Sequence, residues 1–246
     1  FALFVLSLFT FLFYTNSSDN RRFNALTRAV FIEEMKNNTL IMHYTLSNPS
    51  KYRLADTPAT LGDLSSASYR ENAVLLENYL RLLQQLDRQN LSEENQLTYD
   101  ILSACLRSNL SLADFSLYPD PLLPSAGVQT ELPVLLAEYS IKNEQDILDY
   151  LTLLSLIPEY FNSIISYEEE KAAAGLFMAE FTADSVILQC ESILDSDFLE
   201  TTFVKRLELL NDLSSQDKEH YIEKNRSILQ NAVLPSYQTL IDVLSK

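Results

Sequence analysis

The segment that decides the fold is NEQDILDYLTLLSLIPEYFNSIISYEEEKAAAG, which runs from Asn143 to Gly175. Asn143 is a favourable helix N-cap, and the apolar residues after it recur at three- and four-residue spacing. Pro158 either starts a second helix or kinks the first, and Gly175 is placed to end the helical pattern. The segment therefore predicts long helices with one buried face.

The composition extends this prediction to the whole chain. It has 246 residues, of which 47% are hydrophobic and 21% charged, as in a globular protein with a substantial core. Only three glycines occur, so β-hairpins and glycine-rich phosphate loops are disfavoured. We predict an all-α, multi-helix domain.

Helical spacing and caps recur on both sides of that segment, around one long loop. The loop is rich in proline, lies near residues 112–133, and ends at Pro133, which we expect to begin a buried helix. The other expected helices are residues 21–35, Ser66–Asp87, a helix capped by Ser92 and ending near Leu106, a helix capped by Thr182, residues 198–213, and residues 214–246 with a bend at Pro235.

The N-terminal stretch FALFVLSLFTFLFY is apolar at all but two positions. We predict that residues 1–19 are a truncated signal peptide or membrane anchor. The sequence does not begin with Met, and a stretch of 14 residues is shorter than a bilayer span requires. The helical part, residues 20–246, would then lie outside the cytoplasm. The sequence also stops within a helical pattern, so both ends are expected to be cut.

The formal net charge of −16 argues against a nucleic-acid partner, since no cluster of Lys and Arg is available to contact phosphates. Cys105 and Cys190 do not have the spacing of a zinc site or a redox pair. We expect both to be buried free thiols, although the sequence leaves a disulfide between them open.

Catalytic motifs are sparse. His43 and His220 are the only histidines, so the chain cannot contain a His-Glu-x-x-His zinc motif. Asp217 and His220 lie three residues apart, but charged neighbours indicate a solvated helix face. His43 has no nearby ligand partner in the sequence, and we assign it a structural role.

Glu138 is the single acid in an apolar octet that follows Pro133. Two interpretations remain open. It pairs with Lys142 at i+4, a favourable orientation on a helix, or it lines a groove beside Gln129 and Glu131.

Six blocks in order, TLGDLS, LSEENQLTYDIL, GVQTELPVLLAEYSI, DYLTLLSLIPEYF, EEEKAAAGLFM and VLPSYQTLIDVL, resemble the N-terminal half of the bacterial "domain of unknown function 885" family. The resemblance covers residues 24–246. It implies a mostly helical, zinc-dependent metallopeptidase-like protein, exported or lipid-anchored, whose zinc ligands belong to a C-terminal half that is missing here.

The resemblance therefore assigns no catalytic residue and no metal ligand to this chain. It leaves part of a substrate groove, for which the candidates come from GVQTELPVLLAEY and GLFM. These candidates are Gln129, Glu131, Glu138, Tyr139 and Met178.

Two functions are expected from these observations. The first is the N-terminal fragment of an exported zinc-dependent peptidase-like protein, inactive alone, whose partners are a peptide substrate, the missing C-terminal half and, through the N-terminal segment, the membrane. The alternative is a membrane-anchored all-helical binding protein without catalytic activity.

Overall fold

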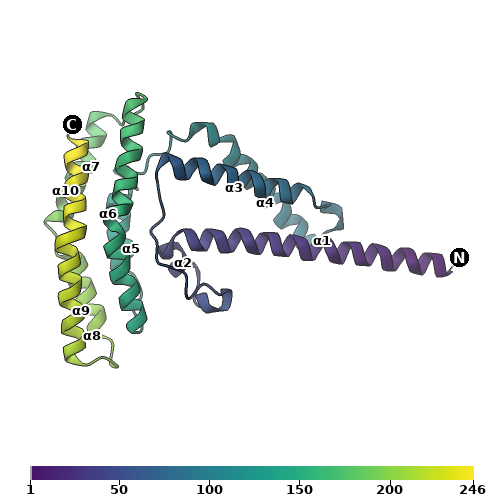
Figure 1. The fold of residues 1–246 in the computed structure, drawn as a ribbon, viewed down its shortest axis with the longest axis horizontal. Coiled ribbons are helices and arrows are strands. Elements are labelled where there is room, and N and C mark those ends of the chain that lie inside the picture. The colour runs from purple at the N-terminus through teal and green to yellow at the C-terminus, as the bar shows by residue number, and fades with distance from the viewer. Residues whose placement is uncertain (1) are drawn as a thin grey trace. The chain divides into compact units, whose positions relative to one another are not determined.

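The computed structural model describes the backbone of residues 2–246 and the side chains of residues 19–246. All regular elements in this part of the chain are helices, which confirms the all-α prediction (Figure 1). The predicted signal peptide or anchor at residues 1–19 lies, apart from Asp19, outside the residues whose side chains are described. No described helix has both the length and the hydropathy needed to cross a bilayer.

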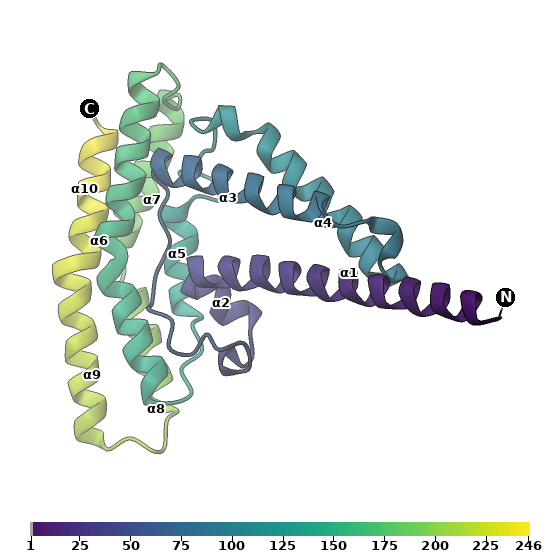
Figure 2. The ribbon, with the colours of Figure 1, turned by 45° about the vertical axis from the view of Figure 1, so that its right-hand side comes forward.

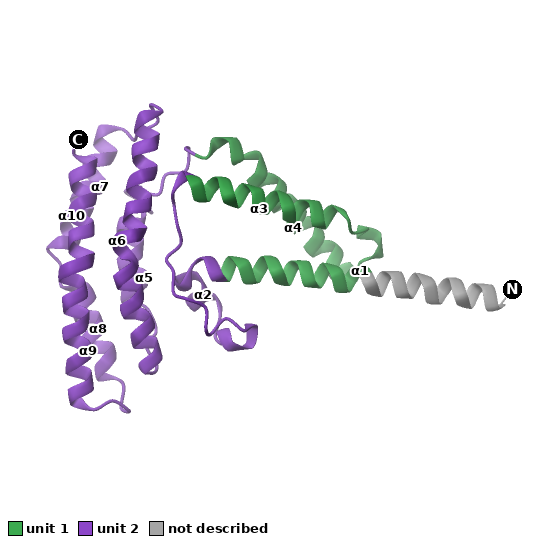
Figure 3. Ribbon diagram, in the orientation of Figure 1, with its two compact units in different colours: residues 1–35, 67–116 green, residues 36–66, 117–246 purple. Residues whose placement is uncertain are grey.

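The chain forms two compact units (Figure 3). Unit 1 comprises residues 1–35 and 67–116, and unit 2 comprises residues 36–66 and 117–246. The sequence predicted one helical region over residues 20–246, since no Gly- or Ser-rich linker marks the three places where the chain passes between the units.

Unit 1 is built from three long helices and two short 3-10 turns. Their bounds are α1 Ala2–Asn37, α3 Ser66–Gln84, η2 Arg88–Asn90, α4 Glu93–Ser111 and η3 Ala113–Phe115. Phe23, Leu83 and Leu106 bring the three long helices into one small core. The predicted cap is confirmed, because the Ser92 side chain accepts a hydrogen bond from the Asn95 amide, and α4 then runs past Leu106 to Ser111.

Unit 2 holds the remaining elements around a much larger core. Their bounds are α2 Thr39–Thr45, η1 Pro49–Tyr52, α5 Val128–Ala137, α6 Glu144–Ala173, α7 Glu180–Leu194, α8 Phe198–Glu208, α9 Ser215–Ile228, η4 Leu229–Val233 and α10 Leu234–Leu244. Helices α6, α7 and α10 run side by side within this unit (Figures 1 and 2). The fold of unit 2 is a helical bundle in which α6 contributes more buried residues than any other helix.

Helix α6 is one continuous element of 30 residues, with Pro158 inside it. Asn143 and Asp146 form a reciprocal capping box at its start, and Gly175 follows its end with φ +73. Ile157 and Phe161, each 1% exposed, bury apolar surface on both sides of the proline. We attribute the uninterrupted helix to this burial, which offsets the cost of about 3 kcal/mol for an interior proline.

The predicted bend at Pro235 takes the form of a π-helical turn. The π segment η4 joins α9 to α10 immediately before the proline, and Val233 at its end is fully buried. An i→i+5 turn changes the hydrogen-bond register, so the missing N–H of the proline falls at the start of a new helical segment rather than in its interior.

Several predicted helix boundaries are wrong. Helix α3 ends at Gln84 rather than at Asp87. Helix α5 begins at Val128, so Pro133 lies inside it and the proline-rich loop ends at Gly127. Helix α7 begins at Glu180, because the Thr182 amide already donates to the Ala179 carbonyl at 2.8 Å. Helix α8 ends at Glu208 rather than at residue 213.

Gly127 is required for space rather than for a turn. Its φ of −93 is open to any residue. A Cβ at this position would lie 2.1 Å from Gln129 Oε1 and 2.5 Å from the Leu123 amide nitrogen. Gly127 therefore meets a steric requirement at the N-cap of α5.

Both cysteines are free thiols, as expected, but only Cys190 is buried. Cys105 is exposed on α4, so the prediction of burial is wrong for this residue. Burial raises the pKa of the Cys190 thiol to about 12, which keeps it protonated at neutral pH.

Candidate functional site

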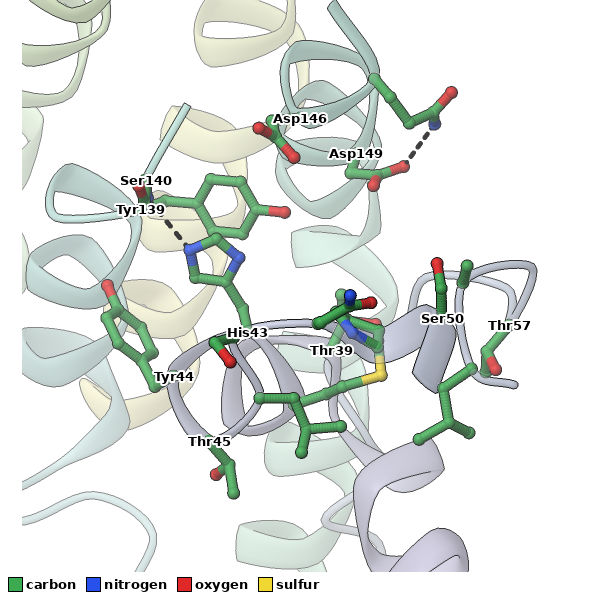
Figure 4. A pocket seen from close by; sticks show the side chains of 18 of the residues that line it. Thr39, His43, Tyr44, Thr45, Ser50, Thr57, Tyr139, Ser140, Asp146 and Asp149 are labelled. Carbon is green, nitrogen blue, oxygen red and sulfur yellow. Dashed lines mark hydrogen bonds between the residues drawn. The ribbon is translucent and has the colours of Figure 1, made fainter. Parts of the chain in front are cut away.

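Unit 2 contains a cavity of about 610 Å³ (Figure 4). Helix α2 and the loop after it lie on one side of the cavity, and the start of α6 lies on the other. One wall comes from residues 39–59 and the other from residues 139–149. Its volume is within the range of small-molecule sites. We therefore treat this cavity as the candidate ligand-binding site in the part of the chain that the structure describes.

The first wall depends on the cap of α2. The Asn38 side chain accepts hydrogen bonds from the amides of Leu40 and Ile41, and its own amide donates to the Leu61 carbonyl at 2.9 Å. The side chain thus starts the helix and ties it to the end of the loop that closes the wall. This arrangement fixes the position of His43 one turn further along α2.

His43 is held against the second wall by two contacts. Its Nε2 accepts a hydrogen bond from the Ser140 amide at 3.1 Å, and its ring stacks on Tyr139 with centroids 3.9 Å apart. Because Nε2 accepts, the neutral ring carries its proton on Nδ1. Burial lowers the pKa of His43, so at neutral pH the ring is uncharged and Nδ1–H is a donor.

Tyr139 lies directly after α5 and is 2% exposed. Its backbone carbonyl and that of Leu136 both accept hydrogen bonds from Arg206, which secures the C-terminal end of α5. Its hydroxyl makes no hydrogen bond with another described residue, and Figure 4 shows it directed toward the side of the cavity where Asp146 and Asp149 lie. Burial, with the two nearby carboxylates, raises the pKa of this hydroxyl.

Asp146 and Asp149 are one turn apart on α6 and supply the negative charge of the cavity. Asp146 Oδ2 accepts from the amides of Lys142 and Asn143 as part of the capping box. Asp149 Oδ1 accepts from the Gln145 side chain at 2.9 Å, whereas its Oδ2 has no hydrogen-bond partner among the described residues. Asp149 is therefore the carboxylate with more capacity for a ligand.

Tyr139 is the one groove candidate from the sequence that lines this cavity. Gln129 is fully buried, and its side chain donates to the Leu123 carbonyl and to Gln189. Glu131 is exposed in the first turn of α5, and Met178 packs beside the core. None of these three residues lines the cavity.

Glu138 is the exposed C-cap of α5, not a residue within its apolar face. No ion pair joins it to Lys142 among the described residues. Helix α5 ends at Ala137, and the Glu138 side chain is exposed. Glu138 does not line the cavity of unit 2.

His43, Asp146 and Asp149 are the cavity residues that sequence reasoning missed. One signal was present, since Asp146 completes the capping box after Asn143 and Asp149 lies one turn further on the same face. No sequence signal joined His43 to them, because about a hundred residues separate the two walls.

No group of three or more His, Cys, Asp or Glu residues is placed to hold a metal ion within the described residues. Asp217 and His220 are both exposed on α9, in agreement with the interpretation of a solvated face.

The model of a family of bacterial proteins of unknown function, DUF885, matches residues 50–246. The chain belongs to this family. The matched range of this DUF885 chain includes Tyr139, Asp146 and Asp149 and begins after His43. No curated protein matches the sequence.

The fold of this DUF885 chain is shared with a crystal structure from Colwellia psychrerythraea that is described as a candidate lipoprotein. The TM-score is 0.79 at 14% sequence identity, and the match covers 94% of this chain and 41% of the other. The chain thus spans about two fifths of the length of that protein, and the similarity concerns the fold.

Proposed function

We propose that this chain is the helical, ligand-binding part of an exported DUF885 protein with peptidase-like activity, and that the cavity in unit 2 holds a segment of a peptide. The Tyr139 side chain carries the proposal, because it is only 2% exposed while its hydroxyl reaches the cavity and has no hydrogen-bond partner among the described residues. An unpartnered hydroxyl directed into a cavity of about 610 Å³ is suited to a polar ligand.

The lining also matches the mixed character of a peptide. Met42, Leu46 and Leu54 offer apolar surface, while His43, Tyr139 and the two aspartates offer hydrogen-bonding groups. Backbone amides and carbonyls of a peptide satisfy such groups, and small side chains fit the apolar part.

Hydrolysis in this proposal belongs to the full-length protein. A zinc ion, as the family resemblance implies, would be held by residues outside residues 1–246 and would polarise a water molecule for attack on the peptide bond. The residues of this chain bind and orient the peptide. Export is supported by the apolar N-terminal stretch and by the description of the Colwellia protein.

The test is calorimetric titration of the full chain, residues 1–246, with unmodified and N-acetylated tripeptides. Tyr139→Phe removes a hydroxyl that has no partner, so the variant keeps its fold and weakens peptide binding by about three- to tenfold. Tyr118→Phe, an exposed tyrosine outside the cavity, is the matched control and keeps full affinity.

Absence of binding by every peptide, acetylated or not, would overturn the proposal. A separate assay of the full-length protein follows cleavage of the same tripeptides by chromatography. Binding without cleavage by the full-length protein would favour the alternative function, a helical binding protein without catalytic activity.

A further inference from the structure

We infer that the cavity recognises the free amino terminus of a peptide, with the terminal ammonium at Asp149 and the adjacent carbonyl oxygen at His43. This inference rests on the proposed function and specifies which part of the peptide the cavity binds.

The charge of the lining favours a cation. Asp146 and Asp149 are its carboxylates, Lys142 is its one cationic side chain, and His43 is neutral. The side chain of Lys142 is exposed and forms no ion pair with either aspartate among the described residues. The lining therefore carries one net negative charge, which favours an ammonium over a carboxylate or phosphate.

Each aspartate keeps one carboxylate oxygen without a hydrogen-bond partner among the described residues, but Asp149 accepts one bond fewer than Asp146. Asp146 Oδ2 accepts from two backbone amides at the start of α6. Asp149 Oδ2 is unoccupied, and its Oδ1 is fixed by Gln145 at 2.9 Å. An ammonium has three donors and no acceptor, so it is complementary to the open oxygen of Asp149.

His43 supplies the opposite type of group. The Ser140 amide occupies Nε2, so the second ring nitrogen presents an N–H donor to the ligand. A ligand with an ammonium group alone would leave the Nδ1–H donor of His43 without an acceptor. A carbonyl oxygen next to the ammonium accepts from it, and the Tyr139 hydroxyl can bond either group because it both donates and accepts.

An α-amino group beside a carbonyl occurs in free amino acids as well as at peptide amino termini. The carboxylate of a free amino acid would bring a second negative charge close to Asp146 and Asp149, whereas the amide carbonyl of a peptide is neutral. The cavity also extends along residues 44–59, which leaves room for further peptide residues. Both observations favour the peptide.

The experiment compares Ala-Ala-Ala-amide with its N-acetylated form by calorimetry at pH 7 on the full chain. Acetylation removes the ammonium and keeps every carbonyl, and we expect it to weaken binding by about ten- to hundredfold. Affinity of the free-amine peptide should also fall above pH of about 8, where an α-amino group loses its proton, while that of the acetylated peptide should not.

Asp149→Asn is the decisive variant. It should weaken binding of the free-amine peptide by at least about tenfold and leave the acetylated peptide unaffected. Asp212→Asn, an exposed aspartate outside the cavity, is the matched control. Circular dichroism checks that both variants retain the helix content of the parent.

Three outcomes would overturn the inference while leaving peptide binding intact. These are equal affinity for the acetylated peptide, unchanged affinity of Asp149→Asn, and binding of methylamine or free alanine as tight as that of the tripeptide. Failure of all peptides to bind would instead overturn the proposed function itself, so the two failures are distinguishable.

Discussion

The two units have the same kind of secondary structure and very different cores. In unit 1 the fully buried apolar cluster consists of residues such as Phe23, Leu83 and Leu106, one or two from each helix. In unit 2 the corresponding cluster draws on helices α5 to α10 and includes aromatic residues such as Phe161 and Tyr237. Helical propensity is therefore similar in both, but the buried area that stabilises the helices is not.

Unit 1 also has polar contacts near its surface. Arg88 forms two hydrogen bonds of 2.7 Å with the Asp100 carboxylate, and Asn20 of α1 accepts from the Ser92 amide and the Asn95 side chain. Such exposed pairs are screened by solvent and salt and contribute little. We expect unit 1 to open at a lower free energy than unit 2, and the following changes test that difference.

The largest effect is expected for Phe161→Ala in unit 2. Phe161 is 1% exposed and packs edge-on against Tyr237 with ring centroids 4.9 Å apart. Loss of the ring should lower the free energy of unfolding of unit 2 by about 3–5 kcal/mol, measured by denaturant titration. Phe181→Ala, at a position 76% exposed, is the control and should change it by less than about 0.5 kcal/mol.

Leu83→Ala makes the equivalent change in unit 1. Leu83 is fully buried, and its truncation should lower the free energy of unfolding of unit 1 by about 2–5 kcal/mol. Because the core of unit 1 is small, this is a larger fraction of the stabilisation that the core supplies. Amide hydrogen exchange should accelerate in α3 and α4 and remain slow in α6 and α10. Leu97→Ala, 62% exposed on α4, is the control. Equal acceleration in both units would refute their separate stability.

A third change concerns a charged cluster inside unit 2. Glu168 is 1% exposed, lies 3.8 Å from Lys171 Nζ, and neither of its carboxylate oxygens has a hydrogen-bond partner. Lys171 is itself held by Asp120 and by the Pro119 carbonyl. Burial outweighs the attraction of Lys171 and raises the pKa of Glu168 from 4.5 to about 7.

Because the folded state holds this proton more tightly than the unfolded state, stability falls as pH rises from about 4.5 to 7 and is constant above that range. The pKa difference corresponds to a loss of about 3 kcal/mol. Glu168→Gln should abolish this slope in denaturation curves of unit 2 recorded across the range. Glu169→Gln, an exposed neighbour, should retain it. A parent protein with no such slope would contradict the expected protonation.

Local sequence determined the helices. Asn143, Ser92 and Gly175 fix helix ends through bonds or dihedral angles that involve only nearby residues, so their roles could be predicted. Pro133 and Pro158 lie inside helices against the local expectation, because burial on either side of a proline keeps a helix intact when the local cost alone would end it.

Tertiary structure alone decided the candidate site and the division into units. Tyr139 could be named from its segment, but His43 meets it across about a hundred residues, and nothing in the spacing of either segment specifies the contact. The same holds for Glu168, which the sequence shows as one of three consecutive acids and which packing alone buries. Caps and periodicity act within a few residues of the chain, whereas a cavity and a shifted pKa depend on which distant side chains exclude water.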